Sequence, residues 1–283
     1  MTNATIGLLH PGDMGGTVGV SARANGLRVL WASEGRSAQT RTRAAGAGLE
    51  DATTLAALIA ASDVILSVCP PHSALDLARA VAAQGFSGIY VDANAVSPGT
   101  AGEIGRIIAR GGAAFVDGGI IGPPARARGT TRLYLSGGQA GHIARLFEQG
   151  PLEAIAMDGG PGAASSLKMA YAAYTKGTAA LLVAIRALAI EAGVDESLLS
   201  EWARSQPELG TRSERAAAET ARKAWRFTGE MAEIAATFDD AGLPEGFFLA
   251  AGEIYEALAG YKDAPDTPSV AEVAKALTGR SRA

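Results

Sequence analysis

The stretch that decides the fold reads Thr5-Ile6-Gly7-Leu8-Leu9-His10-Pro11-Gly12-Asp13-Met14-Gly15-Gly16. A short apolar run leads into a glycine-rich turn, and a segment with helical character follows. In a dinucleotide-binding turn the second glycine lets the backbone approach the pyrophosphate, and the third lets the helix pack closely on the strand. The free N–H groups and positive dipole end of the helix then hold the phosphates. We therefore expect the cofactor turn to consist of His10, Pro11, Gly12, Asp13, Met14 and Gly15.

This turn departs from the G-x-G-x-x-G pattern at one position, because His10 stands where the first glycine belongs. An incomplete fingerprint is also compatible with an ordinary connection between a strand and a helix. The regular alternation of strands and helices that follows it favours the nucleotide-binding interpretation.

Downstream of the turn, short apolar runs alternate with alanine-rich segments of helical character. Continuously apolar runs of four or five residues are typical of strands that are covered on both faces. The predicted strands are Thr5–Leu9, Leu27–Trp31, Val64–Val68, Gly88–Asp92, Ala114–Asp117 and Arg132–Ser136. The predicted helices between them include Gly15–Asn25, Thr54–Ala61, Ser73–Gln84 and Thr100–Arg110. This pattern predicts an α/β fold, a Rossmann-type parallel sheet with right-handed crossovers.

The pattern changes after about residue 158, where the sequence becomes helical throughout. One long helix is predicted over Ala163–Gly193. Further helices are predicted at Glu196–Ser205, Thr211–Ala235 with possible breaks, Gly246–Leu258 and Ser269–Leu277. We therefore expect two domains: an NADP-binding Rossmann domain at 1–158 and an all-helical substrate and dimerisation domain at 159–283, linked by the long helix.

The composition narrows the class of protein. Of the 283 residues 48% are hydrophobic and 19% charged, with a net charge of −4, which indicates a globular chain without a nucleic-acid surface. The single cysteine, Cys69, fits a reducing compartment. The first ten residues lack the pattern of a signal peptide, and the apolar stretch Ala179–Ile190 contains Arg186 and is too short to span a bilayer. We expect a cytoplasmic protein with no membrane partner. The three histidines show no metal-ligand spacing, so no metal site is expected.

The loop after the second strand selects the cofactor. A 2′-hydroxyl is usually bound by an acid, which Glu34 could supply, whereas a 2′-phosphate is accommodated by arginine. Ser33, Arg36 and Ser37 form a polar, cationic loop suited to phosphate, so we expect NADP, with NAD as the less favoured cofactor. A plainer interpretation treats the other charges here as ordinary solvated side chains: Glu34, Arg41 and Arg43.

Cys69 and Pro70 follow the third long strand and are expected to line the cofactor cleft, where proline stiffens the loop. The thiol of Cys69 could be reactive, but a small buried filler is the simpler interpretation.

Four segments resemble the β-hydroxyacid dehydrogenase superfamily, which includes 3-hydroxyisobutyrate and 6-phosphogluconate dehydrogenases and the imine reductases. The likeness covers essentially the whole chain and is greatest to a phosphogluconate-dehydrogenase-like branch with a C-terminal domain of unknown function. The segments are Ile6–Gly15, which resembles the nucleotide turn; Asp92–Pro98, similar to D-x-S-T-x-x-P; Asp117–Pro123, similar to D-A-P-V-S-G-G; and Gly162–Lys168, similar to G-x-G-x-x-x-K.

This resemblance implies an NAD(P)-dependent oxidoreductase in which Lys168 is the catalytic proton donor or acceptor. It also implies that Asn94 contacts both substrate and cofactor, and that the backbone around Gly122 orients the substrate. Lys168 has an independent interpretation, because it sits among apolar residues on a helix that must be largely buried. Partial burial lowers the pKa of an ammonium toward neutrality. The alternative is a lysine whose long stem reaches the surface. Lys176 is offset by about 80° around the helix and is the weaker candidate.

Departures from the family pattern bear on the substrate. Ile121 and Ala172 replace the family's serine and asparagine, and Glu230 aligns with a family lysine that binds the substrate acid. These changes argue against a small carboxylate and favour a larger, less anionic ketone, imine or amine, with Tyr171 and Tyr174 walling the pocket. Alternatively, Glu230 faces solvent, as most glutamates do.

The function predicted from the sequence is NADP-dependent hydride transfer between the nicotinamide and a small-molecule alcohol or carbonyl. An imine reductase is the alternative within enzymes. A non-catalytic NADP-binding regulator is the alternative outside them; His10 and the missing substrate residues favour it, and Lys168 argues against it. The long helix exposes more apolar surface than one small helical domain covers, which predicts a homodimer.

Overall fold

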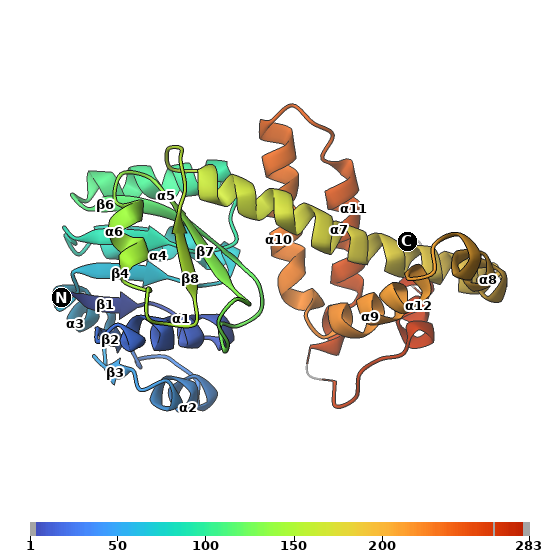
Figure 1. Cartoon of the computed structure of the whole chain (residues 1–283), viewed down its shortest axis with the longest axis horizontal. Helices are drawn as coiled ribbons and strands as arrows, with labels where there is room; N and C mark the ends of the chain where they lie inside the picture. Colours follow the sequence, from blue (N-terminus) through green and yellow to red (C-terminus); the bar gives the residue numbers. More distant parts are fainter. Residues whose placement is uncertain (1–3, 263, 280–283) are drawn as a thin grey trace. The chain divides into compact units, whose positions relative to one another are not determined.

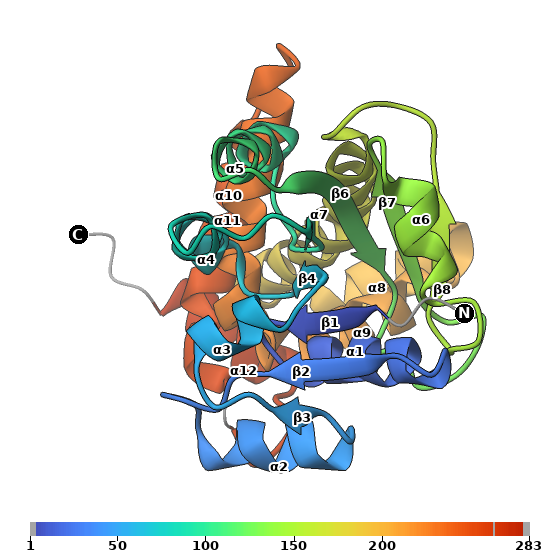
Figure 2. The same cartoon turned by 90° about the vertical axis from the view of Figure 1, so that its left-hand side faces the viewer.

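The frame of the first unit is an eight-stranded sheet with the order β3-β2-β1-β4-β5-β6-β7-β8 (Figures 1 and 2). The computed structural model describes residues 4–262 and 264–279, and the chain divides into two units, 1–169 and 170–283. The strands are β1 (Thr5–Leu8), β2 (Arg28–Trp31), β3 (Glu50–Asp51), β4 (Val64–Ser67), β5 (Ile89–Asp92), β6 (Ala114–Ile121), β7 (Arg132–Ser136) and β8 (Glu153–Ala156).

Helices cover both faces of this sheet, as Figure 2 shows. They are α1 (Asp13–Ala24), α2 (Ala38–Gly46), α3 (Leu55–Ala60), α4 (Ala74–Ala82), α5 (Pro98–Arg110) and α6 (Ala140–Arg145), with a short helix η1 (Pro71–Ser73). Successive strand residues alternate between two apolar cores. Val64 and Leu66 belong to one core and Ile65 to the other. This alternation explains the continuously apolar runs, because each residue of such a strand is buried on one face or the other.

The predicted Rossmann-type α/β fold is confirmed, with one correction to its topology. Every strand pair is parallel except β6 and β7, which are antiparallel. The connection over residues 122–131 contains no helix, so the chain turns back directly instead of crossing over. Two strands and two helices of this unit were absent from the prediction: β3, β8, α2 and α6. The edge strand β3 is two exposed acidic residues, which give no apolar signal.

The second unit is all-helical, as predicted. The long helix α7 (Ala163–Glu191) starts in the first unit and continues into the second. The unit boundary therefore falls inside this helix, one residue after Lys168, and not in the loop before it. The remaining helices are α8 (Asp195–Ser205), α9 (Leu209–Ala221), α10 (Ala224–Asp240), α11 (Gly246–Ala257), η2 (Ala259–Tyr261) and α12 (Val270–Thr278). The predicted stretch Thr211–Ala235 is thus two helices, with the break at residues 222–223.

Arg186 lies in the most apolar part of α7 and is 5% exposed. Its Nε and Nη2 donate to the two carboxylate oxygens of Asp195 at 2.7 and 2.9 Å, and its Nη1 donates to Ser213 Oγ at 2.8 Å. Within the described residues, α7 is the one helix long and apolar enough to cross a membrane by length and composition alone. Core helices of soluble proteins pass the same test, and this one carries a buried ion pair.

Candidate active site

Four polar residues stand side by side across the sheet of the first unit, where strands β4 and β5 end. Ser67, Asp92, Asp117 and Ser136 are paired in register on β4, β5, β6 and β7. Each is fully buried. Ligands of open α/β sheets bind outside the carboxyl ends of the strands, which is the edge this polar row borders.

Asn94 ties together the loops that leave β4 and β5. Its Oδ1 accepts the backbone N–H of Cys69 at 2.6 Å, and its Nδ2 donates to Ser67 Oγ at 3.0 Å and to the carboxylate of Asp92. The side chain is 2% exposed. The polar atoms of Asn94 are therefore already used to position the loop, and its predicted contact with substrate and cofactor stays a prediction.

Cys69 follows strand β4 two residues after Ser67 and is partly buried. Its Sγ is 3.8 Å from Ser67 Oγ, and burial raises the pKa of the thiol to about 12. A thiol that stays protonated at neutral pH is a poor nucleophile. The geometry supports the interpretation of Cys69 as a filler, while Pro70, directly after it, is the N-cap of η1.

Asp117 holds the start of α7. Its Oδ2 accepts the backbone N–H groups of Gly162 and Ser165 at 2.9 and 3.0 Å and the hydroxyl of Ser136 at 3.0 Å, and its Oδ1 accepts the hydroxyl of Ser165 at 2.6 Å. A carboxylate at this place satisfies orphan N–H groups and complements the helix dipole. The sequence indicated Asp117 only through the family motif, and its capping role was missed.

Lys168 follows on the same helix, about one turn beyond this anchor, and is half-buried. The helix passes directly over Gly119 of β6. A Cβ at Gly119 would lie 2.9 Å from Lys168 Cβ and 2.8 Å from the carbonyl oxygen of Ala164. Only glycine lets the helix approach the strand this closely. Asp117 and Gly119 together therefore fix the position of Lys168 on the first unit.

The predicted phosphate turn lies between β1 and α1. A Cβ at Gly15 would be 2.0 Å from the carbonyl oxygen of His10, so close packing requires glycine there. A Cβ at Gly12 would meet no protein atom within 4 Å. Gly12 is also the N-cap of α1 and gives it no side-chain cap. An open space beside an uncapped helix start is the cradle that a pyrophosphate needs, so these residues fit a dinucleotide.

The other residues of the turn have structural partners. Asp13 is exposed and pairs with Arg126 at 2.8 Å, and Met14 packs against the apolar core of one face of the sheet. Pro11 is buried, and its carbonyl oxygen lies 3.5 Å from Nη1 of Arg43. Arg43 is therefore not simply a solvated charge, because it reaches from α2 to the turn.

His10 of the turn forms a pair with Arg36, which lies in the loop between β2 and α2. Arg36 Nη1 lies 2.7 Å from His10 Nε2, and Arg36 Nη2 donates to the carbonyl oxygen of Leu9 at 3.1 Å. Burial, and then the charge of Arg36, lower the pKa of His10 to about 4. The imidazole is therefore neutral at pH 7 and accepts from the guanidinium. Both partners of Arg36 are neutral, so its positive charge is not cancelled by an ion pair.

The loop between β2 and α2 places the remaining cofactor candidates. The backbone N–H of the buried Ser33 donates to Asp51 at 3.2 Å. Ser37 is the N-cap of α2, and its Oγ accepts the N–H of Thr40 at 3.2 Å. Glu34 is exposed.

The predicted substrate residues are divided between the units. In the first, Ile121 is 4% exposed, and Gly122 adopts a φ of +125° against Thr130 at the end of β6. In the second, Tyr171 and Tyr174 are exposed.

Glu230 does not face solvent. It pairs with Lys176 at 2.7 Å, and both side chains are less than one-sixth exposed. The charge of the acid at position 230 is thus neutralised by Lys176. This pairing was missed, because it joins residues of two different helices.

Two family descriptions match the chain. The "NAD binding domain of 6-phosphogluconate dehydrogenase" matches residues 4–157, and a "Domain of unknown function (DUF1932)" matches residues 189–258. An uncharacterized 28.5 kDa protein of Methanothermus fervidus is 33% identical over 195 residues, which are 69% of this chain and 74% of the relative.

Solved structures extend the likeness to the whole chain. A conserved protein of unknown function, described as structurally similar to 3-hydroxyacid dehydrogenases, has a TM-score of 0.67 and 26% identity over 92% of this chain and 100% of its own. 3-Hydroxyisobutyrate dehydrogenase of Mycobacterium tuberculosis has a TM-score of 0.69 and 16% identity over 99% and 100%. An imine reductase of Myxococcus stipitatus has a TM-score of 0.54 and 18% identity over 98% and 100%. At these last two identities the likeness concerns the fold.

Proposed function

The chain belongs to the family defined by the NAD binding domain of 6-phosphogluconate dehydrogenase, a family of NAD(P)-dependent oxidoreductases, and from this premise we propose that it transfers a hydride between NADP and a small-molecule carbonyl or alcohol. The observation that carries the proposal is the placement of Lys168, held by Asp117 and Gly119 in the same unit and along the same sheet as the uncapped turn at Gly12.

The cofactor preference rests on Arg36. Its guanidinium bonds a neutral imidazole and a carbonyl oxygen, so its charge and its remaining N–H donors stay available for a 2′-phosphate. Arg43 adds a second cation beside the same turn. Ser33 and Ser37 complete the polar loop. The pyrophosphate would rest on the N–H groups at the start of α1.

In the proposed reaction Nζ of Lys168 moves a proton. The bound nicotinamide supplies or accepts the hydride at the substrate carbon. Lys168 Nζ gives a proton to the substrate oxygen or nitrogen in reduction and removes it in oxidation, which is the work of a general acid or base. Asn94 fixes the loop at Cys69 through its hydrogen bond to the backbone N–H. The backbone groups of Gly122, at the end of β6, would orient the substrate.

The substrate class follows from what replaces the polar family residues. Ile121 and Ala172 are both buried and apolar, and the charge at Glu230 is already paired with Lys176. This set offers little to a carboxylate, so we propose a ketone or aldehyde with apolar substituents. The same observation favours imine reduction as the second candidate, in which Lys168 would protonate nitrogen. Tyr171 and Tyr174 remain the proposed pocket wall.

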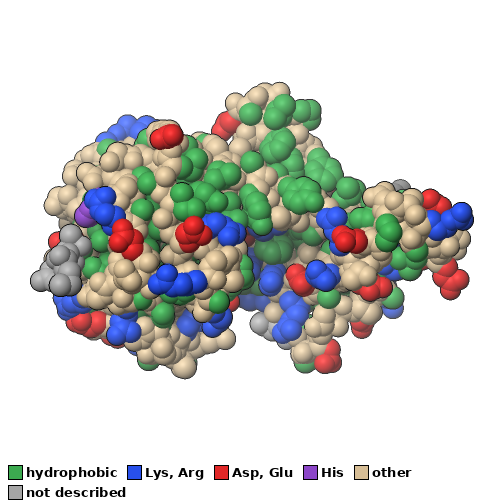
Figure 3. Space-filling view, in the orientation of Figure 1, with side chains coloured by type: hydrophobic (Ala, Val, Ile, Leu, Met, Phe, Trp, Pro, Cys, Tyr) green, Lys and Arg blue, Asp and Glu red, His purple; other side chains and the backbone are tan. Residues whose placement is uncertain are grey.

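A homodimer is the proposed assembly, in a cytoplasmic setting that the single cysteine supports. Tyr174, Leu181 and Leu188 recur every seven residues on α7 and are 64%, 43% and 70% exposed. Such a stripe is typical of a helix that packs against another helix. Figure 3 shows hydrophobic side chains gathered over α7, α10 and α11. A second copy would cover this stripe, and light scattering on the wild type and on Leu181→Glu tests it.

Titration of the purified chain with NADPH and NADH, followed by nicotinamide fluorescence, tests the cofactor. We expect NADPH to bind more tightly, and Arg36→Ala to lower NADPH affinity about tenfold or more while leaving NADH affinity nearly unchanged. Arg41→Ala is the matched control on the same loop.

The outcomes separate the candidates. No binding of either nucleotide contradicts the oxidoreductase proposal. Binding without turnover across a panel of ketones, aldehydes and imines identifies a non-catalytic NADP-binding regulator. Turnover of imines alone identifies an imine reductase.

A further inference from the structure

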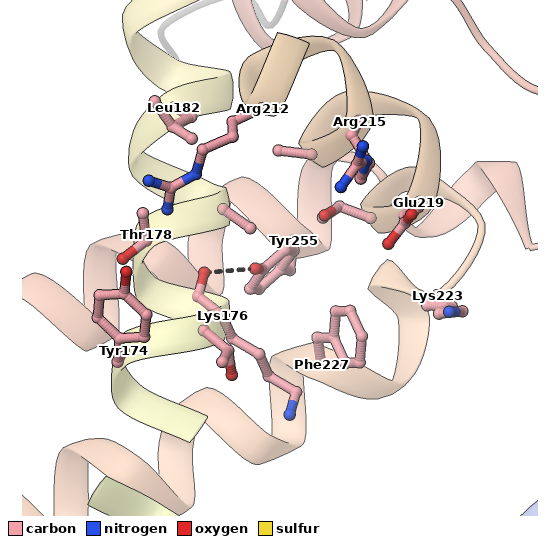
Figure 4. Close-up of a pocket in the computed structure, with 14 residues that line it drawn as sticks. Tyr174, Lys176, Thr178, Leu182, Arg212, Arg215, Glu219, Lys223, Phe227 and Tyr255 are labelled. Carbon is pink, nitrogen blue, oxygen red and sulfur yellow. Dashed lines mark hydrogen bonds between the residues drawn. The ribbon is translucent and has the colours of Figure 1, made fainter. Parts of the chain in front are cut away.

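A cavity of about 380 Å³ lies within the helical unit (Figure 4). Its walls come from α7, α9, α10 and α11 and from the break between α9 and α10. Tyr255 stands at its centre, and side chains of α9 line one wall. All of its lining residues belong to the second unit, whereas the turn at Gly12 and Lys168 belong to the first. Its size is within the range of small-molecule sites.

The polar and charged groups on the floor of the cavity already have partners within the protein. Tyr255 is fully buried, and its hydroxyl donates to the backbone oxygen of Lys176 at 2.6 Å. Lys176 Nζ pairs with Glu230 and lies 5.0 Å from the ring centre of Phe227. The floor therefore offers aromatic surface and no net charge.

The rim is different, because it carries an excess of positive charge. Arg212, Arg215 and Lys223 line it, and Glu219 is the carboxylate among the lining residues. These four side chains are exposed. Across the described part of the chain, none of the three cations is in an ion pair with a carboxylate. Three cations against one acid leave two positive charges at the mouth of a concave site, which attracts anions.

Arg212 and Arg215 can both contact the same ligand. In Figure 4 the guanidinium of Arg212 reaches from α9 across to the α7 wall beside Thr178, while Arg215 stays on the α9 side. Guanidinium groups bind phosphate and carboxylate oxygens in a forked, two-bond geometry. Thr178 adds a hydroxyl donor on the opposite wall.

We propose that this cavity binds a small multivalent anion, a phosphate monoester or a polycarboxylate, through Arg212, Arg215 and Lys223. The aromatic floor takes the uncharged part of the ligand. The three cations belong neither to the proposed cofactor turn nor to the proposed proton transfer at Lys168, so anion binding can be measured separately from hydride transfer.

Isothermal titration calorimetry of the full chain with inorganic phosphate and with citrate, in chloride buffer of matched ionic strength, tests the proposal. One anion per chain is expected. Arg212→Ala with Arg215→Ala should weaken binding at least about tenfold, since two charge-assisted contacts are lost. Glu219→Gln should tighten it about threefold by removing a like charge. Arg222→Ala, which removes an exposed cation just outside the cavity, should leave affinity unchanged.

A second arm separates this site from the cofactor turn. Arg36→Ala should keep the anion affinity of the wild type, because Arg36 belongs to the other unit. Circular dichroism confirms that each variant is folded. The relative affinities of phosphate and citrate tell which ligand class the site serves. Binding that survives the double arginine variant, binding lost with Arg36→Ala, or no binding of either anion would overturn the proposal.

Discussion

The two units position their important side chains by different means. In the first, backbone geometry does it: Gly15 and Gly119 permit close approach, and Asp117 receives N–H groups of a helix start. In the second, buried charges meet across helices, as Arg186 does with Asp195 and Lys176 with Glu230. The first arrangement fixes the backbone itself, whereas the second rests on side-chain pairs between helices.

The largest effect is expected at Lys168, which tests whether the first unit carries the chemistry. Lys168→Ala should lower the rate of hydride transfer about 10²- to 10⁴-fold, the range for loss of a general acid or base. NADPH affinity should change less than about threefold. Single-turnover absorbance at the nicotinamide band measures the rate, and fluorescence titration measures affinity. A variant that retains most of the wild-type rate would assign the proton to another group.

Arg186→Ala tests the claim that buried charge stabilises the helical unit. It leaves Asp195 without its partner in a mostly buried setting, so we expect a loss of about 3 kcal/mol in the free energy of unfolding. Urea unfolding followed by circular dichroism measures it. Arg204→Ala, an exposed arginine on α8, is the control and should cost less than about 0.5 kcal/mol. If both variants lost the same free energy of unfolding, the buried ion pair would not be what stabilises the helical unit.

Two variants of the phosphate turn test the claim that backbone geometry positions the residues of the first unit. Gly15→Ala places a Cβ against the carbonyl oxygen of His10 and should cost about 2–3 kcal/mol of stability. Gly12→Ala meets no protein atom, so stability should change by less than about 0.5 kcal/mol while NADPH affinity falls tenfold or more. Thermal unfolding and nucleotide titration on the two variants separate these effects. Unchanged affinity in Gly12→Ala would place the pyrophosphate elsewhere.

The smallest effect concerns pH. His10 has a pKa of about 4 in the folded chain, below its ordinary value near 6.5. The unfolded chain binds the proton first, so His10 contributes stability above pH 6.5 that is lost as pH falls from 6.5 to 4. We expect a loss on the order of 2 kcal/mol across this window, relative to His10→Gln, whose amide can accept from Arg36 without titrating. The free energy of unfolding is measured against pH for both proteins. The same pH dependence in the two would contradict this prediction.

The sequence pattern predicted those strands whose residues are apolar because they are buried on both faces of the sheet. The strands ending at Leu8, Ser67 and Asp92 were visible because both faces of the sheet are covered. The exposed strand β3 was not, since Glu50 and Asp51 bury nothing.

In the candidate site, too, some residues could be proposed from the sequence, whereas contacts between distant residues could not. The turn at Gly12 and the lysine at 168 were proposed from spacing and motif, and their roles stay predictions. The capping role of Asp117 and the pairs His10–Arg36 and Lys176–Glu230 depend on strand register and helix packing, which bring together residues far apart in the sequence.

The unit boundary inside α7 bears on how such chains can be recombined. Asp117 holds the start of this helix, and the boundary follows Met169, so Lys168 is inherited with the nucleotide-binding unit. A gene crossover at residue 169 between relatives would exchange the whole helical unit and leave Lys168 with its own sheet. The joined helix keeps its phase only if no residue is gained or lost at the junction, because each one turns the following side chains by about 100°. Chimeras made at this point would therefore combine different helical units with one constant nucleotide-binding unit and its Lys168.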